Sequence, residues 1–337
     1  MDNRSAPLKT IAFFNNKGGV GKTSMVFHLS WMLAELGFRT LAVDFDPQSN
    51  LTSAFLEEDE LVRLWPDEVH SRTVLGAVQP LIDKLGDIEP ITPLRVRADL
   101  SLLPGDLGLG LFEDRLSQAW NDCMAEGAER ADGFRVMSAF HRIIANAANE
   151  SDSDVVLIDV GPSIGALNRA ALVSADFVVI PLGADLFSIQ GLRNLGPTLR
   201  SWRDGWKRRI SLGTVSNSTP SGSMKPLGYV LLNPSVRENR PVKSYQRWVD
   251  RIPEAFCRSV LGVPYSVSKP GVEDRYQLAM VKHFKSLMPM AQDARKPMFM
   301  LTPKDGAIGG HAAAVSDCRT QFAGLSRRIL REIGLMP

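Results

Sequence analysis

The sequence predicts an α/β protein with a doubly wound, mostly parallel sheet and helices on both faces. Short apolar runs rich in β-favouring residues alternate with stretches of helical periodicity along nearly the whole chain of 337 residues. The chain opens with a strand, a glycine-rich loop, a helix and a second strand, which is the order of a right-handed crossover between parallel strands. We therefore expect a single domain over residues 1–337.

The first helix is predicted by apolar residues at 3-4-3 spacing, and Gly37 is placed to end it. Further strands are expected at residues 8–14, 40–44, 100–103, 155–159, 177–181, 229–232 and 298–301. Two segments interrupt the pattern. We expect an acidic, helix-prone insertion at about residues 57–86 and a mobile loop, rich in Ser, Gly and Pro, at about 216–226.

Composition limits the class of protein. The chain is 44% hydrophobic and 23% charged, which is ordinary for a soluble globular protein. Its three cysteines are far apart and its five histidines lack paired spacing, so neither a disulfide framework nor a Cys or His metal site is predicted. No apolar run is long enough to span a bilayer and no secretory signal begins the chain, so a cytoplasmic location is expected.

The charge is unevenly distributed along the chain. Residues 1–190 carry 15 Lys and Arg against 27 Asp and Glu, whereas residues 191–337 carry 24 against 10. The small net charge of +2 therefore hides a strongly basic C-terminal part. Such a part is a candidate surface for a polyanion.

The segment 17–23, K-G-G-V-G-K-T, predicts a phosphate-binding loop. Its glycines allow backbone N–H groups to turn towards phosphate oxygens, and the helix that follows adds its positive N-terminal end. Lys22 is expected to reach the β- and γ-phosphates, and Thr23 to give its hydroxyl to Mg²⁺. A glycine-rich turn without a ligand is the alternative, but the flanking strand and helix favour a fold of the P-loop NTPase type.

Carboxylates follow two of the predicted strands. Asp44 and Asp46 end the strand at 40–44, and Asp159 ends the strand at 155–159. Parallel sheets bind ligands at the carboxyl ends of their strands, where a carboxylate can hold Mg²⁺ or orient an attacking water. A merely exposed carboxylate is the alternative, more so for Asp44 than for Asp159.

The sequence resembles the ParA/MinD family of deviant Walker ATPases, and more closely its ParA partition branch. The resemblance covers nearly the whole chain. It is carried by the segment 17–23, D-F-D-P-Q-S-N at 44–50, L-L-P-G-D-L at 102–107, V-L-I-D-V-G-P-S at 156–163, A-D-F-V-V-I-P at 175–181 with Ser188 and Gly191, and K-P-M-F at 296–299.

The resemblance implies an ATPase that uses ATP and Mg²⁺. Lys17 stands at the position of the signature lysine, which reaches the partner's phosphates in a dimer; Asp46 stands at that of the water-positioning aspartate, and Asp159 at that of the Walker B aspartate. The expected catalytic residues are Lys17, Lys22 and Asp46, and the expected metal-binding residues are Thr23, Asp46 and Asp159. The expected nucleotide-binding residues are Lys17, Gly18, Gly19, Val20, Gly21, Lys22, Thr23, Ser24 and, near the adenine, Asn233.

The resemblance further implies partners: a homodimer formed on ATP binding, nonspecific double-stranded DNA of the nucleoid, and a ParB-like or other activating protein. The candidate DNA-binding residues are Arg237, Lys282, Lys285, Arg327 and Arg328. The sequence departs from the family at Gly161, where partition ATPases commonly have proline. No DNA-binding helix-turn-helix precedes the first strand, which argues against operator-specific autoregulation.

Two alternatives stay open. A MinD-like membrane switch would need an amphipathic C-terminal helix, and apolar residues from Val315 to Ile329 do share one helical face, although packing on the sheet explains them equally well. The second alternative is a P-loop metabolic ligase, for which the sequence offers no specific motif.

Overall fold

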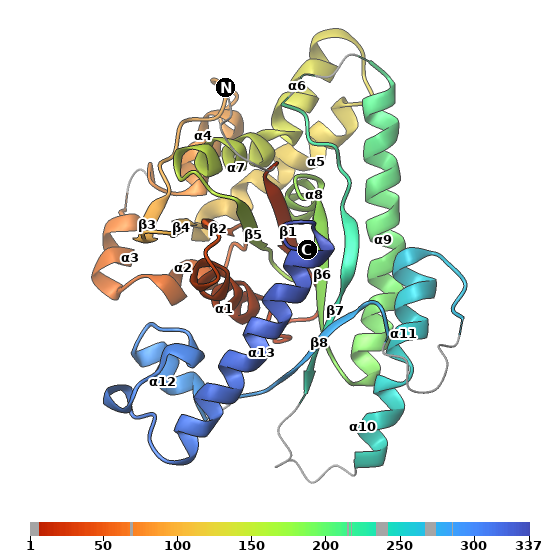
Figure 1. The fold of residues 1–337 in the computed structure, drawn as a ribbon. Coiled ribbons are helices and arrows are strands. Elements are labelled where there is room, and N and C mark those ends of the chain that lie inside the picture. The colour runs from red at the N-terminus through yellow and green to blue at the C-terminus, as the bar shows by residue number, and fades with distance from the viewer. Residues whose placement is uncertain are drawn as a thin grey trace.

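The computed structural model describes residues 7–67, 70–213, 216, 218–233, 242–266, 274–284 and 286–337, except for the side chains of residues 233 and 242–245. Within these residues the chain forms a sheet of eight strands in the order β3-β4-β2-β5-β1-β6-β7-β8 (Figure 1). All neighbouring strands run parallel except β3, which is antiparallel to β4. The predicted doubly wound, mostly parallel sheet is confirmed.

Six of the strands lie where the sequence predicts them. They are β1 Lys9–Phe13, β2 Thr40–Asp44, β4 Leu100–Leu103, β5 Val155–Asp159, β6 Phe177–Gly183 and β7 Lys225–Asn233. The sequence did not predict β3 (Leu94–Arg97) or β8 (Gln277–Lys282). Both are edge strands with a weak sequence signal: arginines alternate with the apolar residues of β3, and β8 has a run of only four apolar residues, which does not distinguish a strand from another buried segment.

The strand predicted at 298–301 is wrong, because Met298–Met300 forms a 3₁₀ turn, η3. Pro297 and Pro303 flank it, and proline cannot donate to a strand ladder. The N–H of Met298 instead donates to His28 Nε2, at 3.1 Å. An apolar run this short does not distinguish a strand from another buried segment.

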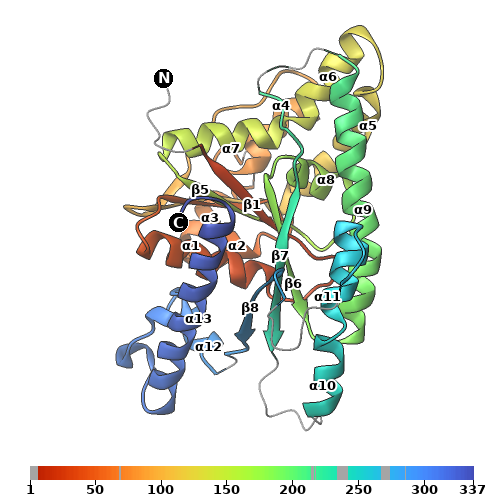
Figure 2. The ribbon, with the colours of Figure 1, turned by 45° about the vertical axis from the view of Figure 1, so that its right-hand side comes forward.

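Helices cover both faces of the sheet (Figure 2). One apolar core lies under α4 to α9, and the other lies under α1, α2, α12 and α13. The helices are α1 Lys22–Glu35, α2 Asn50–Phe55, α3 Glu58–Leu64, α4 Val74–Ile82, α5 Glu113–Asp122, α6 Gly127–Met137, α7 Ala139–Glu150, α8 Ala166–Val173, α9 Leu186–Ser211, α10 Val242–Val249, α11 Ile252–Ala255, α12 Met288–Asp293 and α13 Gly310–Glu332. Shorter helical segments are η1 Leu107–Phe112, η2 Phe256–Leu261 and η4 Pro303–Asp305.

The apolar face of the last helix, α13, is packed against the protein. Cys318, Phe322, Leu325 and Ile329 are all buried in the same core as α1. A membrane-inserting helix would need this face for lipid. Across the part of the chain that the structure describes, no helix has the length and apolar character needed to span a membrane.

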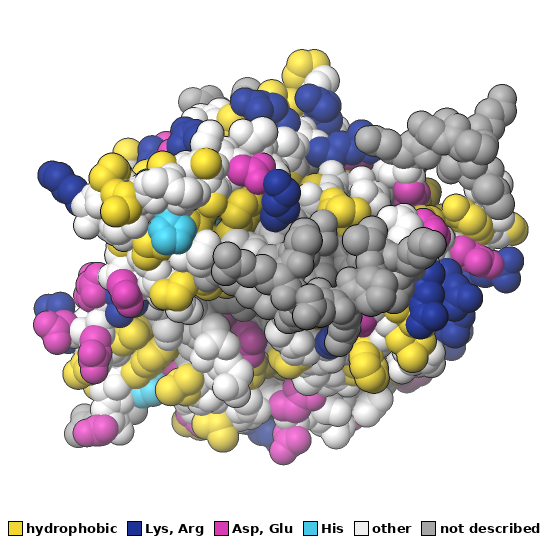
Figure 3. Space-filling model, turned by 90° about the horizontal axis from the view of Figure 1, so that it is seen from below, with side chains coloured by type: hydrophobic (Ala, Val, Ile, Leu, Met, Phe, Trp, Pro, Cys, Tyr) yellow, Lys and Arg dark blue, Asp and Glu magenta, His cyan; other side chains and the backbone are white. Residues whose placement is uncertain are grey.

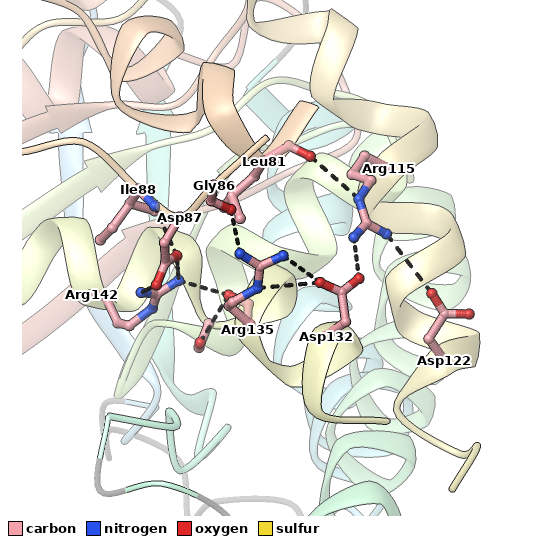
Figure 4. A network of polar contacts seen from close by, with 10 residues as sticks. Leu81, Gly86, Asp87, Ile88, Arg115, Asp122, Asp132, Arg135 and Arg142 are labelled. Carbon is pink, nitrogen blue, oxygen red and sulfur yellow. Dashed lines mark hydrogen bonds and ion pairs between the residues drawn. The ribbon is translucent and has the colours of Figure 1, made fainter. Parts of the chain in front are cut away.

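The predicted insertion at 57–86 contains α3 and α4, and ion pairs tie its end to the helical layer (Figure 4). Arg142 on α7 makes two hydrogen bonds to Asp87, at 2.8 and 2.7 Å. The carboxylate of Asp132 on α6 accepts hydrogen bonds from both Arg115 and Arg135, and Arg135 also donates to the Gly86 carbonyl. The network therefore fastens the chain that follows α4 to α6 and α7, and Arg115 links α5 to α6.

The predicted mobile loop at 216–226 is shorter than expected, because Lys225 and Pro226 belong to β7. Residues 214, 215 and 217 lie outside the described residues. In the described part, the carbonyl of Pro220 accepts a hydrogen bond from the Trp206 indole at 2.9 Å.

A buried histidine joins the first helix to the C-terminal part. The carbonyl of Ser24 lies 2.6 Å from His28 Nδ1, and since Nε2 accepts from Met298, the ring proton is on Nδ1. The ring also stacks on Phe322 of α13, with centroids 4.9 Å apart. Burial lowers the pKa of His28 to about 4, and the Ser24 carbonyl only partly opposes this effect. His28 is therefore neutral and structural.

We predict that His28 destabilises the fold as the pH falls. The unfolded chain binds a proton at His28 with a pKa near 6.5, but the folded protein does so only near 4, so stability is lost as the pH falls below about 6.5. The loss should reach roughly 3 kcal/mol below pH 4. Urea unfolding between pH 7 and 4.5 should show a shallower loss for His28→Gln than for the wild type. Equal pH slopes would contradict the prediction.

Candidate functional site

A cavity of about 880 Å³ opens at the carboxyl edge of the sheet. The loop 18–24, the β2–α2 connection and residues 281–298 line it. Figure 3 views the molecule from this side and shows Lys and Arg side chains gathered at its right-hand and upper margins. The cavity therefore lies where an open parallel sheet binds its ligands.

The glycine-rich loop has the backbone that a phosphate cradle requires. Gly19 and Gly21 both have φ of 70°, a left-handed conformation that favours glycine. A Cβ on Gly21 would also meet Leu232 of β7 at 2.8 Å. Val20 between them is buried. The helix α1 begins directly at Lys22, where the loop ends. The unpaired N–H groups of its first turn therefore lie at the cavity.

Asn15 anchors the start of this loop. Its side chain is buried and donates to the Pro181 carbonyl of β6 at 2.7 Å. Its Oδ1 accepts from the N–H of Lys17 at 3.0 Å. Because β6 is the neighbour of β1, Asn15 holds the loop against the sheet at the point where it leaves β1.

Lys22 is a buried cation with a weak partner. Its ammonium donates to the Lys17 carbonyl at 3.4 Å. Burial lowers the pKa of Lys22, although the charges of Asp159 and Asp46 act in the opposite direction. A buried ammonium is stable only beside negative charge, so this geometry favours an anion on the loop.

Asp159 is the opposite case, a buried carboxylate without a hydrogen bond of ordinary geometry to either oxygen among the described residues. Burial raises its pKa well above the usual range, and the neighbouring Asp44 raises it further. The two lie side by side because Asp44 on β2 pairs with Asp159 on β5. The Thr23 hydroxyl lies close enough to lower the pKa in part.

Asp44 and Asp46 have different surroundings. Both oxygens of Asp44 are used: one accepts from Asp46 N, and the other accepts the N–H and the hydroxyl of Thr52, both at 2.8 Å. Burial raises the pKa of Asp44 to about 7. Asp46 lines the cavity, and one of its oxygens accepts from Gln48 N at 3.0 Å. Asp44 therefore holds the start of α2, while Asp46 faces the cavity.

Lys17 pairs with Asp185, a residue that was not predicted from the sequence. Its ammonium lies 2.8 Å from Asp185 and 5.6 Å from the centre of the Phe187 ring. Asp185 also begins α9 by accepting the Ser188 N–H at 2.7 Å. Partial burial by itself would raise the pKa of Asp185, but Lys17 and this N–H lower it. Its place after a strand, three residues before Ser188, is the sequence signal of a helix cap.

The donor set fits Mg²⁺ beside a triphosphate. The ion prefers oxygen ligands, and Asp159 offers two buried carboxylate oxygens without ordinary hydrogen bonds next to the Thr23 hydroxyl. No group of three or more His, Cys, Asp or Glu in the described part of the chain could hold a metal by itself. Phosphate oxygens and waters would complete the shell of a Mg²⁺ ion held here.

Most of the predicted site residues line the cavity: Gly18, Gly19, Gly21, Lys22, Thr23, Ser24 and Asp46. Asp159 lies behind them, close enough to interact with Lys22, Asp46 and Thr23, whereas Val20 is buried and Lys17 contacts Asp185 instead. The side chains of Asn233, Arg237 and Lys285 lie outside the described residues. Two other DNA-binding candidates carry carboxylate partners: Lys282 pairs with Asp317 at 2.7 Å, and Arg328 with Glu332 at 3.0 Å. Arg327 is exposed on α13. The spacing of Arg328 and Glu332 is that of neighbours on one helix face, whereas the sequence gives no indication that Lys282 pairs with Asp317, 35 positions away.

Comparison with known proteins places the chain among partition ATPases. A family model described as an AAA domain, AAA_31, matches residues 8–212. Chromosome partitioning protein ParA of Caulobacter vibrioides is 31% identical over 212 residues, which are 62% of this chain and 68% of that protein. The chromosome-partitioning ATPase Soj of Thermus thermophilus is 31% identical over 207 residues, 61% of this chain and 68% of Soj.

Solved structures with the same fold cover nearly the whole chain. Protein DIP2308 from Corynebacterium diphtheriae has a TM-score of 0.69 and 25% identity, over 96% of this chain and 98% of that one. An ATP complex of a variant of Cyanothece McdA has a TM-score of 0.63 and 17% identity, over 96% of each chain, and supports the fold alone.

We predict that Asp159→Asn stabilises the protein without nucleotide but weakens binding of Mg²⁺ with ATP. The buried carboxylate repels Asp44 and lacks ordinary hydrogen bonds, so removing its charge should raise the free energy of unfolding by about 1–2 kcal/mol at pH 8. Thermal unfolding, with and without MgATP, measures both effects. A variant that is less stable without ligand and equally stabilised by MgATP would contradict the assignment.

Proposed function

Because the chain belongs to the ParA/MinD family of deviant Walker ATPases, we propose that it is an ATP-dependent dimerisation switch that hydrolyses ATP and partitions or positions DNA or another cargo. The observation that carries the proposal is that two buried charged groups beside one loop are incompletely satisfied. Lys22 donates only to a backbone carbonyl, at 3.4 Å, and neither oxygen of Asp159 has a hydrogen bond of ordinary geometry among the described residues, although the two charges attract each other. A triphosphate with its metal ion would supply a partner to both.

The residues divide the chemistry among them. The loop N–H groups and Lys22 hold the phosphates, and Thr23 and Asp159 would hold Mg²⁺, which neutralises charge on the phosphate oxygens. Asp46 orients the water that attacks the γ-phosphorus, while the bond from this phosphorus to the β–γ bridging oxygen breaks and leaves ADP and phosphate. Because ATP hydrolysis requires positioning above all, small shifts of Asp46 should change the rate strongly.

Dimerisation involves Lys17. In the single chain its ammonium lies on Asp185 at the beginning of α9, and its side chain is about one third exposed (35%). In a face-to-face dimer, we infer, Lys17 leaves Asp185 and reaches the phosphates of the partner. Phosphate oxygens at the transition state carry more negative charge than one carboxylate, which favours the exchange.

We predict opposite effects for Lys17→Ala and Asp185→Asn. With a nonhydrolysable ATP analogue, the wild type should elute as a dimer from size-exclusion chromatography and Lys17→Ala as a monomer. Asp185→Asn keeps an N-cap for α9 but loses the ion pair, so its dimer should form at about 2- to 5-fold lower protein concentration. An ATP-independent monomer for the wild type would refute the switch while leaving nucleotide binding intact.

We propose that the dimer binds DNA and is located on the nucleoid. A ParB-like or other protein would activate its ATP hydrolysis. The C-terminal part carries the excess of 24 basic over 10 acidic residues, and two copies would double it. Among the described residues, exposed Arg327 and the cations Arg203, Lys207 and Arg208 of α9 have no carboxylate partner. The relatives named above are chromosome-partitioning proteins.

We predict salt-sensitive binding to duplex DNA of any sequence in the ATP state. For four phosphate contacts, raising the salt from 50 to 200 mM should weaken binding about 100-fold. Fluorescence anisotropy with Arg203→Ala, Lys207→Ala and Arg208→Ala combined should show weaker binding and a smaller salt slope. Arg72→Ala, an exposed arginine of the acidic half, is the matched control. Equal retention at both salt concentrations would exclude DNA as the matrix.

A further inference from the structure

We propose that Asn168 and Glu113 are positioning residues for ATP hydrolysis, because together they hold the loop 160–165 against Asp46. The inference rests on the proposed function, since it assigns a task to residues outside the phosphate loop. Neither residue touches the loop 17–23 in the structure. Both act through the segment that follows Asp159.

Asn168 is directed at this segment. The side chain is fully buried on α8, and its amide nitrogen donates to the Gly161 carbonyl at 2.8 Å and to the Ser163 carbonyl at 2.7 Å. The Ser163 hydroxyl lies 3.2 Å from the same nitrogen. All of these bonds go to the loop and none to the helix that carries Asn168. One side chain therefore holds the loop backbone at two points, Gly161 and Ser163.

Glu113 fixes the other end of the loop. It begins α5, far from α8 in sequence, yet its two carboxylate oxygens accept the N–H groups of Ala166 and Leu167 at 2.5 and 2.7 Å. Gly165 comes so close that a Cβ there would meet a Glu113 oxygen at 2.6 Å. A carboxylate at a helix N-terminus is favoured by the unpaired N–H groups and by the helix dipole. The Glu113 carboxylate therefore clamps the end of the loop, where α8 begins.

The loop in turn borders the site. A Cβ on Gly161 would lie 3.1 Å from an oxygen of Asp46, and Pro162 lines the cavity. Glycine at 161 has no ring to restrict its backbone, unlike the proline that partition ATPases commonly have there. The clamp by Asn168 and Glu113 supplies this missing restraint. If the loop is released, Asp46 loses the neighbour that keeps its carboxylate in place.

The two residues should consequently change turnover and leave ATP affinity nearly unaltered. Asn168→Ala and Glu113→Gln are expected to lower kcat about 10-fold or more, because a small displacement of a positioned group has effects of this size. The KM for ATP and the binding of a fluorescent ATP analogue should change less than about 2-fold. A residue that only stabilises the fold would instead reduce the active fraction and spare the kcat per bound nucleotide.

The experiment measures ATPase kinetics, analogue binding and thermal unfolding of the full chain. Ser174→Ala is the matched control for Asn168→Ala, because it also removes a buried hydrogen bond from the end of α8. Asp114→Asn controls for Glu113→Gln, because it removes an exposed charge beside it on α5. Asp46→Ala gives the rate without the water-positioning carboxylate.

The outcomes separate the two proposals. A wild type without ATPase activity would refute the proposed function itself. An active wild type whose kcat survives both substitutions, or falls equally in both controls, would overturn the role of Asn168 and Glu113 alone. If Asn168→Ala does not fold, Glu113→Gln decides the matter, since it keeps the length of the side chain and one acceptor while removing the charge and the second acceptor. A kcat near that of Asp46→Ala with normal nucleotide binding would establish the positioning role.

Discussion

The structure depends on buried charges at the carboxyl ends of β2 and β5. Asp44 and Asp159 are neighbours in the sheet and both fully buried, and the charge of Asp44 adds to the effect of burial in raising the pKa of Asp159. Asp44 is satisfied by Thr52 and so serves the fold, whereas Asp159 is left for a ligand. Lys22, a neighbouring cation, is itself destabilised by burial. The buried charges of the site are therefore incompletely compensated, and a nucleotide with a divalent cation would stabilise them.

Rigid supports surround these charges. Asn15 ties the phosphate loop to β6, and His28 ties the helix after it to η3 and α13. The network of Figure 4 holds the connection after α4 to α6 and α7, on the face of the sheet opposite α1 and α13. The supports therefore come from both faces of the sheet. Lys17 and its partner Asp185 lie at the edge of these supports and are each about one third exposed (35% and 32%).

Lys17 and the loop after Asp159 are proposed to affect two different properties of the site, the formation of the dimer and the position of Asp46. The ion pair of Lys17 concerns the encounter with a second copy, because this side chain lies at the surface. The clamp of Asn168 and Glu113 concerns the position of Asp46 inside one copy. The first proposal concerns the association of protomers, and the second concerns the rate of hydrolysis in each protomer.

The sequence by itself determined the sheet type, six of its strands and the phosphate loop, because these depend on local periodicity and on glycine spacing. It could not determine the edge strands β3 and β8, whose apolar runs are interrupted or short, nor the turn at Met298, which is held by a distant histidine. It also could not pair Lys17 with Asp185 or Glu113 with α8, since these contacts join residues 168 and 53 or 54 positions apart. Local propensity determines elements, whereas only packing of the whole chain decides which charges meet.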